Sequence, residues 1–363
     1  GAYRYDGHCA ALTKEEAAAK LDAGTPYVIR QKMPREGTTV FTDAVYGEIS
    51  VDNDELEDQI LIKSDGMPTY NFANVIDDHL MEITHILRGS EYLASTPKYS
   101  LLYQALGWEQ PTYVHLPLIT KEGGKKLSKR EGDASFEDLM AEGYLPEAIV
   151  NYIVLLGWSP GDDREFFTLE ELTKVFSVKG INKSPSVFDM NKLTWMNGEY
   201  LRKLSPDAFH EAALPWIRKA VTRQDIDTAY LSGLLHQRTE VLSDIPEAVD
   251  FVDNLPEYGA ELYLHKKQKC RYDNSLENLT AAREALAALT DWNQETVHES
   301  LFALIGAMEI KTGQMMWPVR TALSGKAFSP GGGVDLAVLL GREETLRRID
   351  KGILILQKAV DAQ

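Results

Sequence analysis

The stretch THILRGSEYLASTPKYSLLYQALGWEQPTYVHLPLI, residues 84–119, contains a strand, a helix and a second strand in that order. THILRG is a short apolar run typical of a buried strand, and TYVHLPLI is another. Between them, Thr96 as N-cap and Pro97 in the first turn begin a helix that runs to Gly107. A strand–helix–strand unit predicts a parallel α/β sheet, in which ligands bind beyond the carboxyl ends of the strands.

A basic loop, GGKKLSKREGD at residues 123–133, follows the second strand. Lys125, Lys126, Lys129 and Arg130 fall within six residues of a chain whose net charge is −17. Because cations at this spacing repel one another, we expect an anion to bind there. The loop fits either a solvated surface turn or, through KLSKR, the K-x-S-K loop of class I aminoacyl-tRNA synthetases. A P-loop is disfavoured because G-x-x-x-x-G-K-[ST] is not met.

Local patterns divide the chain into an α/β N-terminal part and an all-α C-terminal part. Before the basic loop, YVIRQKM, TVFTDAVYGEISV and DQILIKS have the composition of strands, and a capping box at Thr13 and Glu16 begins an Ala-rich helix. After it, capping-box spacing at 135–138 and 168–171 and apolar residues at helical spacing predict helices. The last part of the chain is expected to be a helical bundle or cage.

Composition limits the class of protein. The chain has 363 residues, of which 44% are hydrophobic and 26% charged, as in ordinary globular domains. No apolar run approaches the ~20 residues that span a bilayer, so no membrane segment is expected. Cys9 and Cys270 are too few for a disulfide framework, which favours a reducing cytoplasm. The acidic total argues against a protein that coats DNA.

A longer stretch, KSDGMPTYNFANVIDDHLMEITHILRGSEYLASTPKY at residues 63–99, resembles the second half of the catalytic domain of bacterial-type glutamyl-tRNA synthetases, a class I family. The similarity continues in HLPLI, LPEAIVNYIVLLGW, VFDMNKLTWMNGEYL and KTGQMMWPVRTALSG, and so covers essentially the whole chain. The resemblance implies the second half of a Rossmann-like catalytic domain with an inserted acceptor-binding segment, followed by an all-α anticodon-binding region.

The resemblance also implies a division into domains. We expect the C-terminal portion of the acceptor-binding insertion at 1–69 and the second half of the Rossmann-like domain at 70–120. The K-x-S-K loop and a stem-contact domain are expected at 121–205, and the anticodon-binding region at 206–363, with two subdomains that meet near 262.

The family reaction implies roles for the basic loop. Glutamate attacks the α-phosphate of ATP, which gives glutamyl-adenylate and pyrophosphate, and the glutamyl group then passes to the 3′ end of tRNA(Glu). Lys129, Lys126 and Ser128 are the expected catalytic residues, since a cation beside the leaving pyrophosphate stabilises the transition state. Lys126, Lys129 and Arg130 are expected to bind ATP, which arrives with Mg²⁺.

The residues that match the family's glutamate-binding positions are Tyr70, Asn74, Arg88 and Tyr92. Arg88, at the end of a predicted strand, can pair bidentately with a carboxylate. The alternatives are a core tyrosine for Tyr70 and, for Arg88, a structural ion pair with one of the two aspartates at 77 and 78.

The helical part is expected to bind the tRNA anticodon. Arg238, Arg320 and the turn Ser329-Pro330 match the family's anticodon-reading positions. Arginine suits this role because it stacks on splayed bases and hydrogen-bonds to their edges. The alternative for Arg320 is a cap at a helix end that only stabilises the fold. The expected partners are tRNA(Glu), glutamate and ATP, without DNA or membrane, for a cytoplasmic monomer.

The second class I signature, H-x-G-H, does not occur in these 363 residues. The family's other glutamate-binding groups belong to the same missing half. We therefore expect a chain that begins inside a longer protein and is inactive alone. Tyr5 and Cys9 have the Y-x-x-x-C spacing found in a zinc site of some family members. Structural zinc sites need four ligands, so we expect neither zinc nor another bound metal.

Three alternative functions follow from the same residues. A glutaminyl-tRNA synthetase is disfavoured because the anticodon domain of that family is a β-barrel, whereas this C-terminal part is helical. A tRNA-modifying paralogue lacks the anticodon-binding half that this chain has. A non-catalytic tRNA-binding module stays open, since a chain without H-x-G-H can retain recognition without chemistry.

Overall fold

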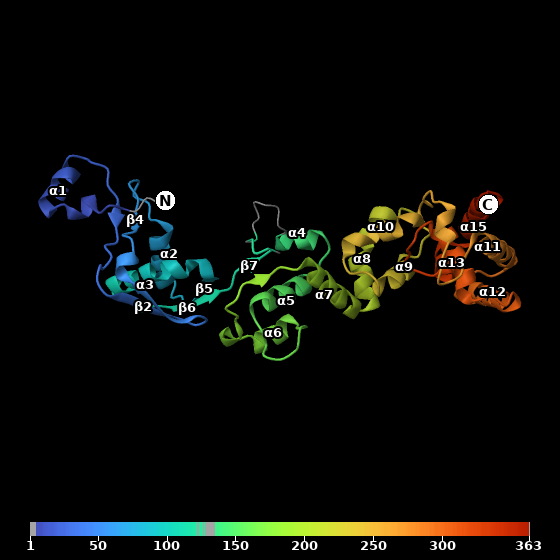
Figure 1. Cartoon of the computed structure of the whole chain (residues 1–363), viewed down its shortest axis with the longest axis horizontal. Helices are drawn as coiled ribbons and strands as arrows, with labels where there is room; N and C mark the ends of the chain where they lie inside the picture. Colours follow the sequence, from blue (N-terminus) through green and yellow to red (C-terminus); the bar gives the residue numbers. More distant parts are fainter. Residues whose placement is uncertain (1–4, 122, 126, 128–134, 363) are drawn as a thin grey trace. The chain divides into compact units, whose positions relative to one another are not determined.

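The computed structural model describes residues 5–121, 123–125, 127 and 135–362 (Figure 1). The chain forms two compact units. The first, called the sheet unit, contains Gly1–Asp133 and Asn151–Asp189, and the second, called the helical unit, contains Ala134–Val150 and Met190–Gln363. The chain therefore passes between the units three times, and helix α5 (Pro146–Gly157) begins in the helical unit and ends in the sheet unit.

A four-stranded sheet forms the centre of the sheet unit, with strand order β3–β2–β6–β5. Strands β5 (His85–Gly89) and β6 (Thr112–Leu116) are parallel and are joined by helix α3 (Thr96–Leu106), which confirms the predicted strand–helix–strand unit. Strand β2 (Thr38–Asp43) is parallel to β6 but antiparallel to β3 (Gly47–Asp52). The sheet is thus mixed, with an antiparallel hairpin at one edge.

The segment TVFTDAVYGEISV, which reads as a single strand, is this hairpin. Asp43 closes its turn, because Oδ1 accepts hydrogen bonds from the backbone nitrogens of Val45 and Tyr46, each at 2.9 Å. Gly47 follows with φ of 85°, a left-handed conformation that glycine adopts without steric cost. An aspartate that bonds to the backbone two and three residues ahead is a turn signal that alternating β-formers conceal.

Helix α3 begins differently from the prediction that Thr96 is its N-cap. The preceding residues already form the 3-10 helix η3 (Ser90–Ser95), so Ser95 occupies the cap position and Thr96 is the first helical residue. The Thr96 hydroxyl instead donates to the carbonyl of Tyr92 at 2.9 Å. Helix α2 (Tyr70–Leu80) packs beside α3. Their shared core consists of Val75, Tyr99, Leu102 and Tyr103.

Short elements complete the sheet unit. The two remaining strand pairs are β1 (Ile29–Arg30) with β4 (Ile60–Ile62), antiparallel, and β7 (Ile119–Thr120) with β8 (Ser186–Val187), parallel. The other helices are α1 (Lys14–Asp22), α6 (Leu169–Val175), η1 (His8–Ala11), η2 (Asn53–Glu55) and η5 (Val178–Gly180). The capping boxes predicted at 13–16 and 168–171 are formed.

In the described residues the helical unit contains helices and no strand. Its α-helices are α4 (Phe136–Ala141), α7 (Met190–Lys203), α8 (Pro206–Ala220), α9 (Thr228–His236), α10 (Ile245–Val249), α11 (Tyr272–Ala287), α12 (Gln294–Ala307), α13 (Thr312–Ser324), α14 (Gly333–Leu340) and α15 (Arg342–Asp361). The 3-10 helices are η6 (Leu242–Asp244), η7 (Asp250–Val252) and η8 (Ala260–Tyr263). One apolar core, from Leu201 to Leu356, joins α7 to α15 and the three 3-10 helices. This confirms the predicted α/β part followed by an all-α part.

A fully buried arginine ties the helical unit together. Arg348 on α15 donates Nη1 to the carbonyls of Phe251 and Leu323, at 2.8 and 2.7 Å. Its Nη2 donates to the carbonyl of Val252 at 3.0 Å, and its Nε lies 2.6 Å from Glu344. The Nε, Nη1 and Nη2 donors of Arg348 thus all bond to groups within the helical unit. Among the described residues, no helix is both long enough and apolar enough to span a membrane.

Candidate functional sites

The first site surrounds Arg88, at the carboxyl end of β5. Strand register places Arg88 opposite His115 on β6. The guanidinium carbon lies 5.4, 4.7 and 5.5 Å from the ring centroids of Tyr92, Tyr99 and Tyr113. Aromatic faces attract a cation at these distances, so the rings hold the guanidinium without using its N–H donors. The side chain can therefore donate to a ligand.

Four buried polar atoms in this region have no hydrogen-bond partner among the described residues: Asn74 Oδ1, Arg88 Nε, Tyr103 OH and Tyr113 OH. Each such atom costs about 1–3 kcal/mol unless a ligand or water satisfies it. Burial raises the pKa of Tyr103 to about 12 and also raises that of Tyr113. Both hydroxyls are therefore protonated at neutral pH and able to donate. A polar ligand or water could satisfy these atoms.

The structure rejects the structural alternatives for two predicted residues. Tyr70, the first residue of α2, is 61% exposed, so it is not a core tyrosine. Its ring centroid lies 6.3 Å from that of Tyr92, which brings both near Arg88. No ion pair between Arg88 and either aspartate at 77 or 78 is formed in the described part of the chain. Burial raises the pKa of Asp78, although the Arg88 charge opposes the shift.

Sequence reasoning missed a buried pair behind this site. Asp43 and His115 are fully buried, with Oδ2 and Nδ1 2.6 Å apart, and the same oxygen accepts from the His115 backbone nitrogen at 3.1 Å. His115 Nε2 lies 3.3 Å from the Thr96 hydroxyl, which itself bonds to the Tyr92 carbonyl. This network supports the backbone that carries Tyr92 and Arg88. A histidine within an apolar strand was a signal, but its partner lies 72 residues away.

The basic loop is described only at its beginning. The backbone nitrogen of Lys121 donates to the carbonyl of Lys125 at 2.7 Å, and Gly124 donates to Lys121 at 3.0 Å. Gly123 and Gly124 have φ of 83° and 80°, so this turn requires the two glycines. The predicted catalytic and ATP-binding residues Lys126, Ser128, Lys129 and Arg130 lie outside the described residues.

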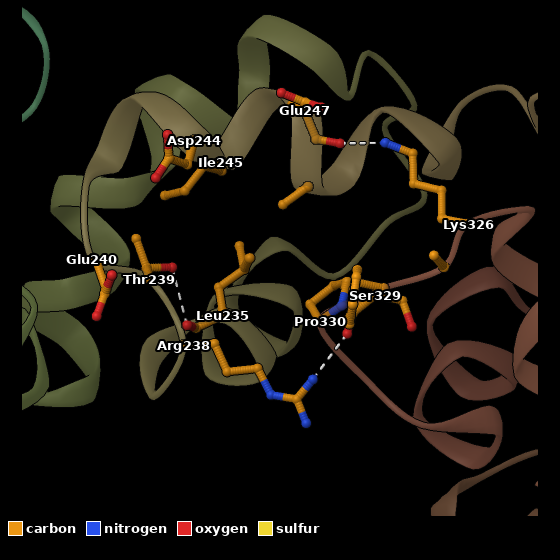
Figure 2. Close-up of a pocket in the computed structure, with 13 residues that line it drawn as sticks. Leu235, Arg238, Thr239, Glu240, Asp244, Ile245, Glu247, Lys326, Ser329 and Pro330 are labelled. Atoms are coloured by element: carbon orange, nitrogen blue, oxygen red, sulfur yellow. Dashed lines mark hydrogen bonds between the residues drawn. The ribbon is translucent and has the colours of Figure 1, made fainter. Parts of the chain in front are cut away.

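The second site lies in the helical unit and is called the helical-unit pocket below (Figure 2). It is a cavity of about 640 Å³, and it brings together three of the four residues predicted to bind tRNA. Arg238, just beyond α9, donates Nη1 to the carbonyl of Ser329 at 3.0 Å. Ser329 and Pro330 are buried in the loop between α13 and α14, and Arg320 on α13 also bonds to this loop.

Arg320 serves both the fold and the pocket. Its Nη1 donates to the carbonyl of Lys326 and to the hydroxyl of Ser329, each at 3.2 Å, and its guanidinium carbon lies 4.4 Å from the ring centroid of Trp317. Its Nη2 is buried and has no partner within the described ranges. Burial, together with the charge of Arg238, lowers the pKa of Arg320. The stabilising role weighed as an alternative is therefore present, beside a donor left for a ligand.

Comparisons with known proteins identify the family of the chain. Residues 2–195 match the catalytic domain of class I tRNA synthetases (E and Q), and residues 208–353 match an anticodon binding domain. A glutamate–tRNA ligase of Clostridium botulinum is 58% identical over 357 residues, which cover 98% of this chain and 73% of the relative. One from Clostridium tetani is 55% identical over 359 residues, which cover 99% and 73%. The chain belongs to the glutamate–tRNA ligase family.

Solved structures of this family share the fold. The chain is similar to a glutamate–tRNA ligase from Elizabethkingia meningosepticum, determined in complex with its amino acid, with a TM-score of 0.85 and 35% identity. That match covers 98% of this chain and 75% of the other. A second structure, from Elizabethkingia anophelis, has a TM-score of 0.84 and 34% identity. The family expected from sequence is confirmed, and the glutaminyl and tRNA-modifying alternatives are not favoured.

No group of three or more His, Cys, Asp or Glu side chains in the described part of the chain could hold a metal ion. Cys9 is exposed, and the Tyr5 hydroxyl accepts a hydrogen bond from the backbone of Ala10 at 3.0 Å. The Tyr5 ring also packs under Arg30, at 4.0 Å from the guanidinium carbon. The Tyr5 side chain is thus held by contacts to Ala10 and Arg30.

Proposed function

We propose that this chain contributes three sites to the ATP-dependent attachment of glutamate to tRNA(Glu): a glutamate site, an ATP-binding loop and an anticodon site. The observation that carries the proposal is Arg88, held over three tyrosine rings with a buried Nε that lacks a partner in the described structure. Such an arginine binds a carboxylate through a fork of parallel hydrogen bonds. Glutamate supplies that group.

Around Arg88, the other predicted residues would complete the glutamate site. Asn74 has a free amide oxygen that can accept from the ligand's ammonium group. Tyr70 is exposed and Tyr92 half-buried, and their hydroxyls can donate to a carboxylate. A ligand here would satisfy atoms that the protein alone leaves unpaired, which favours binding by removing a desolvation cost.

The basic loop would act in the first chemical step. A glutamate carboxylate oxygen attacks the α-phosphorus of ATP, a bond to that phosphorus forms, and the bond to the β-phosphate oxygen breaks. Negative charge then grows on the leaving pyrophosphate. Lys129 and Lys126 would stabilise this charge, Arg130 would bind the phosphates, and Ser128 would let the loop close. Mg²⁺ would travel with ATP as part of the substrate.

The helical unit would then select the tRNA. Arg238 and Arg320 offer donors to base edges, and the buried turn at Ser329 and Pro330 shapes the cavity beside them. The protein would act as a cytoplasmic monomer and would bind neither DNA nor membrane. These assignments rest on the family's motif positions and on the cavity.

The Lys129→Ala substitution tests the proposal. It is made in a form of the protein that also carries an H-x-G-H element, because the reaction needs both signatures. Removing one charge that acts on a transition state costs about 2.7–4 kcal/mol, so pyrophosphate exchange should fall about 100- to 1000-fold while tRNA affinity is unchanged. Lys358→Ala, which removes an exposed lysine of α15 outside the loop, is the control and should exchange normally. An unchanged rate for Lys129→Ala removes it from the mechanism.

A further inference from the structure

An exposed aromatic side chain lies at the rim of the helical-unit pocket. Phe328 lines the cavity and is 89% exposed, more than any other large hydrophobic residue in the described part of the chain. A phenylalanine ring in water lacks the stabilisation that its burial would provide. A partner that covers the ring would recover part of this free energy.

The loop around Phe328 is fixed on both sides of the exposed ring. On the N-terminal side, Lys326 Nζ lies 2.6 Å from Asp250 Oδ1. On the C-terminal side, Ser329 is buried, and its carbonyl accepts from Arg238 at 3.0 Å. The backbone that carries the ring is therefore ordered before any ligand arrives. Preorganisation of this kind lowers the entropic cost of binding.

The charges around the ring favour a nucleobase over a phosphate. Arg238, Arg320 and Lys326 attract a polyanion, but each of them already bonds to the protein. The carboxylates of Asp244 and Glu247 line the far side of the cavity, opposite Arg238 (Figure 2), and repel phosphate. A flat, uncharged group with hydrogen-bonding edges fits this mixture. An unpaired base is such a group, and aromatic side chains stack on it.

We propose that Phe328 stacks on an unpaired base of the tRNA anticodon loop and strengthens binding without reading which base it is. The inference rests on the proposed function, because it names a contact within the anticodon site. Every base has a π-face, so stacking is tolerant of sequence. The ring would hold the loop in place while the arginine donors read base edges.

The test is a titration of the 363-residue chain with a fluorescently labelled RNA hairpin that has the anticodon stem and loop of tRNA(Glu). Phe328→Ala should weaken binding by about 10- to 100-fold, the effect of losing one stacked base. The same factor is expected for hairpins in which each anticodon base is replaced. Phe328→Trp should keep the affinity, and its fluorescence should be quenched on binding, whereas Phe328→Leu should bind as weakly as the alanine variant.

Phe302→Ala is the matched control, because Phe302 on α12 is 39% exposed and lies away from the pocket. It should bind like wild type, and the thermal unfolding of the Phe328 variants should be unchanged. Wild-type affinity in Phe328→Ala overturns the inference. Full affinity in Phe328→Leu also overturns it, since an apolar contact would then suffice. So does a loss of self-association in Phe328→Ala, measured by sedimentation, without loss of RNA binding.

The experiment distinguishes failure of the proposed anticodon site from failure of the stacking contact. If Arg320→Ala loses affinity and Phe328→Ala does not, the anticodon site stands and the stacking contact is wrong. If the wild-type chain binds no hairpin, the proposed function of the helical unit and the stacking contact are both wrong.

Discussion

The two sites each place an arginine over aromatic rings, but they use its donors differently. Arg88 in the sheet unit forms no hydrogen bond within the described residues, and only rings hold it. Arg320 in the helical unit donates twice to the loop that lines the neighbouring pocket. The N–H donors of Arg88 thus have no hydrogen-bond partner in the described part of the chain, whereas two hydrogen bonds of Arg320 stabilise the fold. A substitution at each should have a different signature.

The cause lies in the backbone that carries each site. Arg88 lies in a strand whose register with β6 already fixes its position. The loop from Lys326 to Gly332 has no such ladder, so its carbonyls need side-chain donors. An arginine on a strand can keep its N–H donors for a ligand, whereas one beside an irregular loop has to use some of its donors to bond the carbonyls of that loop.

The largest expected effect is at Arg88. Arg88→Ala should lower kcat/KM for glutamate by at least about 100-fold, or roughly 3 kcal/mol, because a charged bidentate contact is lost. Stability should not fall, because the substitution also removes an unpaired buried donor. Pyrophosphate exchange against glutamate concentration, in a form that carries H-x-G-H, measures this. Arg88→Lys keeps the charge but not the fork and should remain impaired. If pyrophosphate exchange by Arg88→Ala depends on glutamate concentration as in the wild type, Arg88 does not bind glutamate and the contrast with Arg320 is wrong.

Lowering the pH should destabilise the two units over different pH ranges. In the helical unit, hydrogen bonds from Arg347 and Arg348 lower the pKa of Glu344 to about 2. A carboxyl with a depressed folded pKa stabilises above its unfolded value of about 4.5, and this stability, about 3 kcal/mol, is lost as the pH falls toward 2. In the sheet unit, burial lowers the pKa of His115, against the bond to Asp43.

The pH range in which stability is lost therefore differs between the two units. A histidine with a depressed folded pKa stabilises above its unfolded value of about 6.5, and that stability is lost as the pH falls below it. The sheet unit should weaken first. Hydrogen exchange of peptides from β6 and from α15, corrected for intrinsic rates, measures each unit. His115→Gln should remove the pH dependence of stability in the sheet unit only, and Glu344→Gln should remove it in the helical unit only. If both units instead begin to weaken together, below about pH 4.5, this assignment is wrong.

A smaller effect is expected at the helical-unit pocket, where we propose that the anticodon binds. Arg320→Ala and Arg238→Ala should each lose about 1–3 kcal/mol of discrimination between tRNA(Glu) and an anticodon-altered tRNA. Arg320→Ala should also lower stability more, since it removes two bonds to the loop rather than one. Aminoacylation of both tRNAs beside thermal unfolding measures this. Arg342→Ala, exposed and bonded to the carbonyl of Ala287, is the control. Equal loss with both tRNAs would remove the reading role.

The smallest expected effect is a change in stability at Tyr113, which tests whether the polar atoms around Arg88 lack protein partners. Tyr113 OH is buried without a partner in the described structure, so Tyr113→Phe should leave stability unchanged or raise it by up to about 1 kcal/mol. Tyr152 OH donates to the Asp189 carbonyl at 3.0 Å and accepts from its nitrogen at 2.6 Å. Tyr152→Phe should therefore cost about 1 kcal/mol or more. Urea unfolding compares them; equal losses would mean that Tyr113 OH is satisfied.

Local patterns in the sequence predicted what local physics determines. The capping boxes, helix α3 and the parallel β5–β6 pair follow from residues that are neighbours in sequence, and the structure confirms them. Thr96 was misassigned as a cap because its preceding residues also form a helix. The bond between Asp43 and His115 could not be predicted, since strand order decides which distant residues meet.

The sites were predicted by resemblance rather than by pattern. Motif positions led to Arg88 and to Arg238 with Arg320, and the structure shows the surroundings that the motifs do not contain: the tyrosine rings and Trp317. These partners depend on packing between helices and strands that are far apart in sequence. The roles of Lys126, Ser128, Lys129 and Arg130 remain predictions, as do the domain limits at 69, 120 and 205.

The three passages of the chain between its units have a practical consequence for anyone who wishes to divide the protein. A single cut cannot release either unit, because the segment Ala134–Val150 belongs to the helical unit and is followed by Asn151–Asp189 of the sheet unit. A recombinant anticodon-binding piece that starts at residue 206 would lack Leu145 and Leu201, which pack in the helical core. A stable piece requires both segments of the helical unit, rejoined by a linker that replaces residues 151–189.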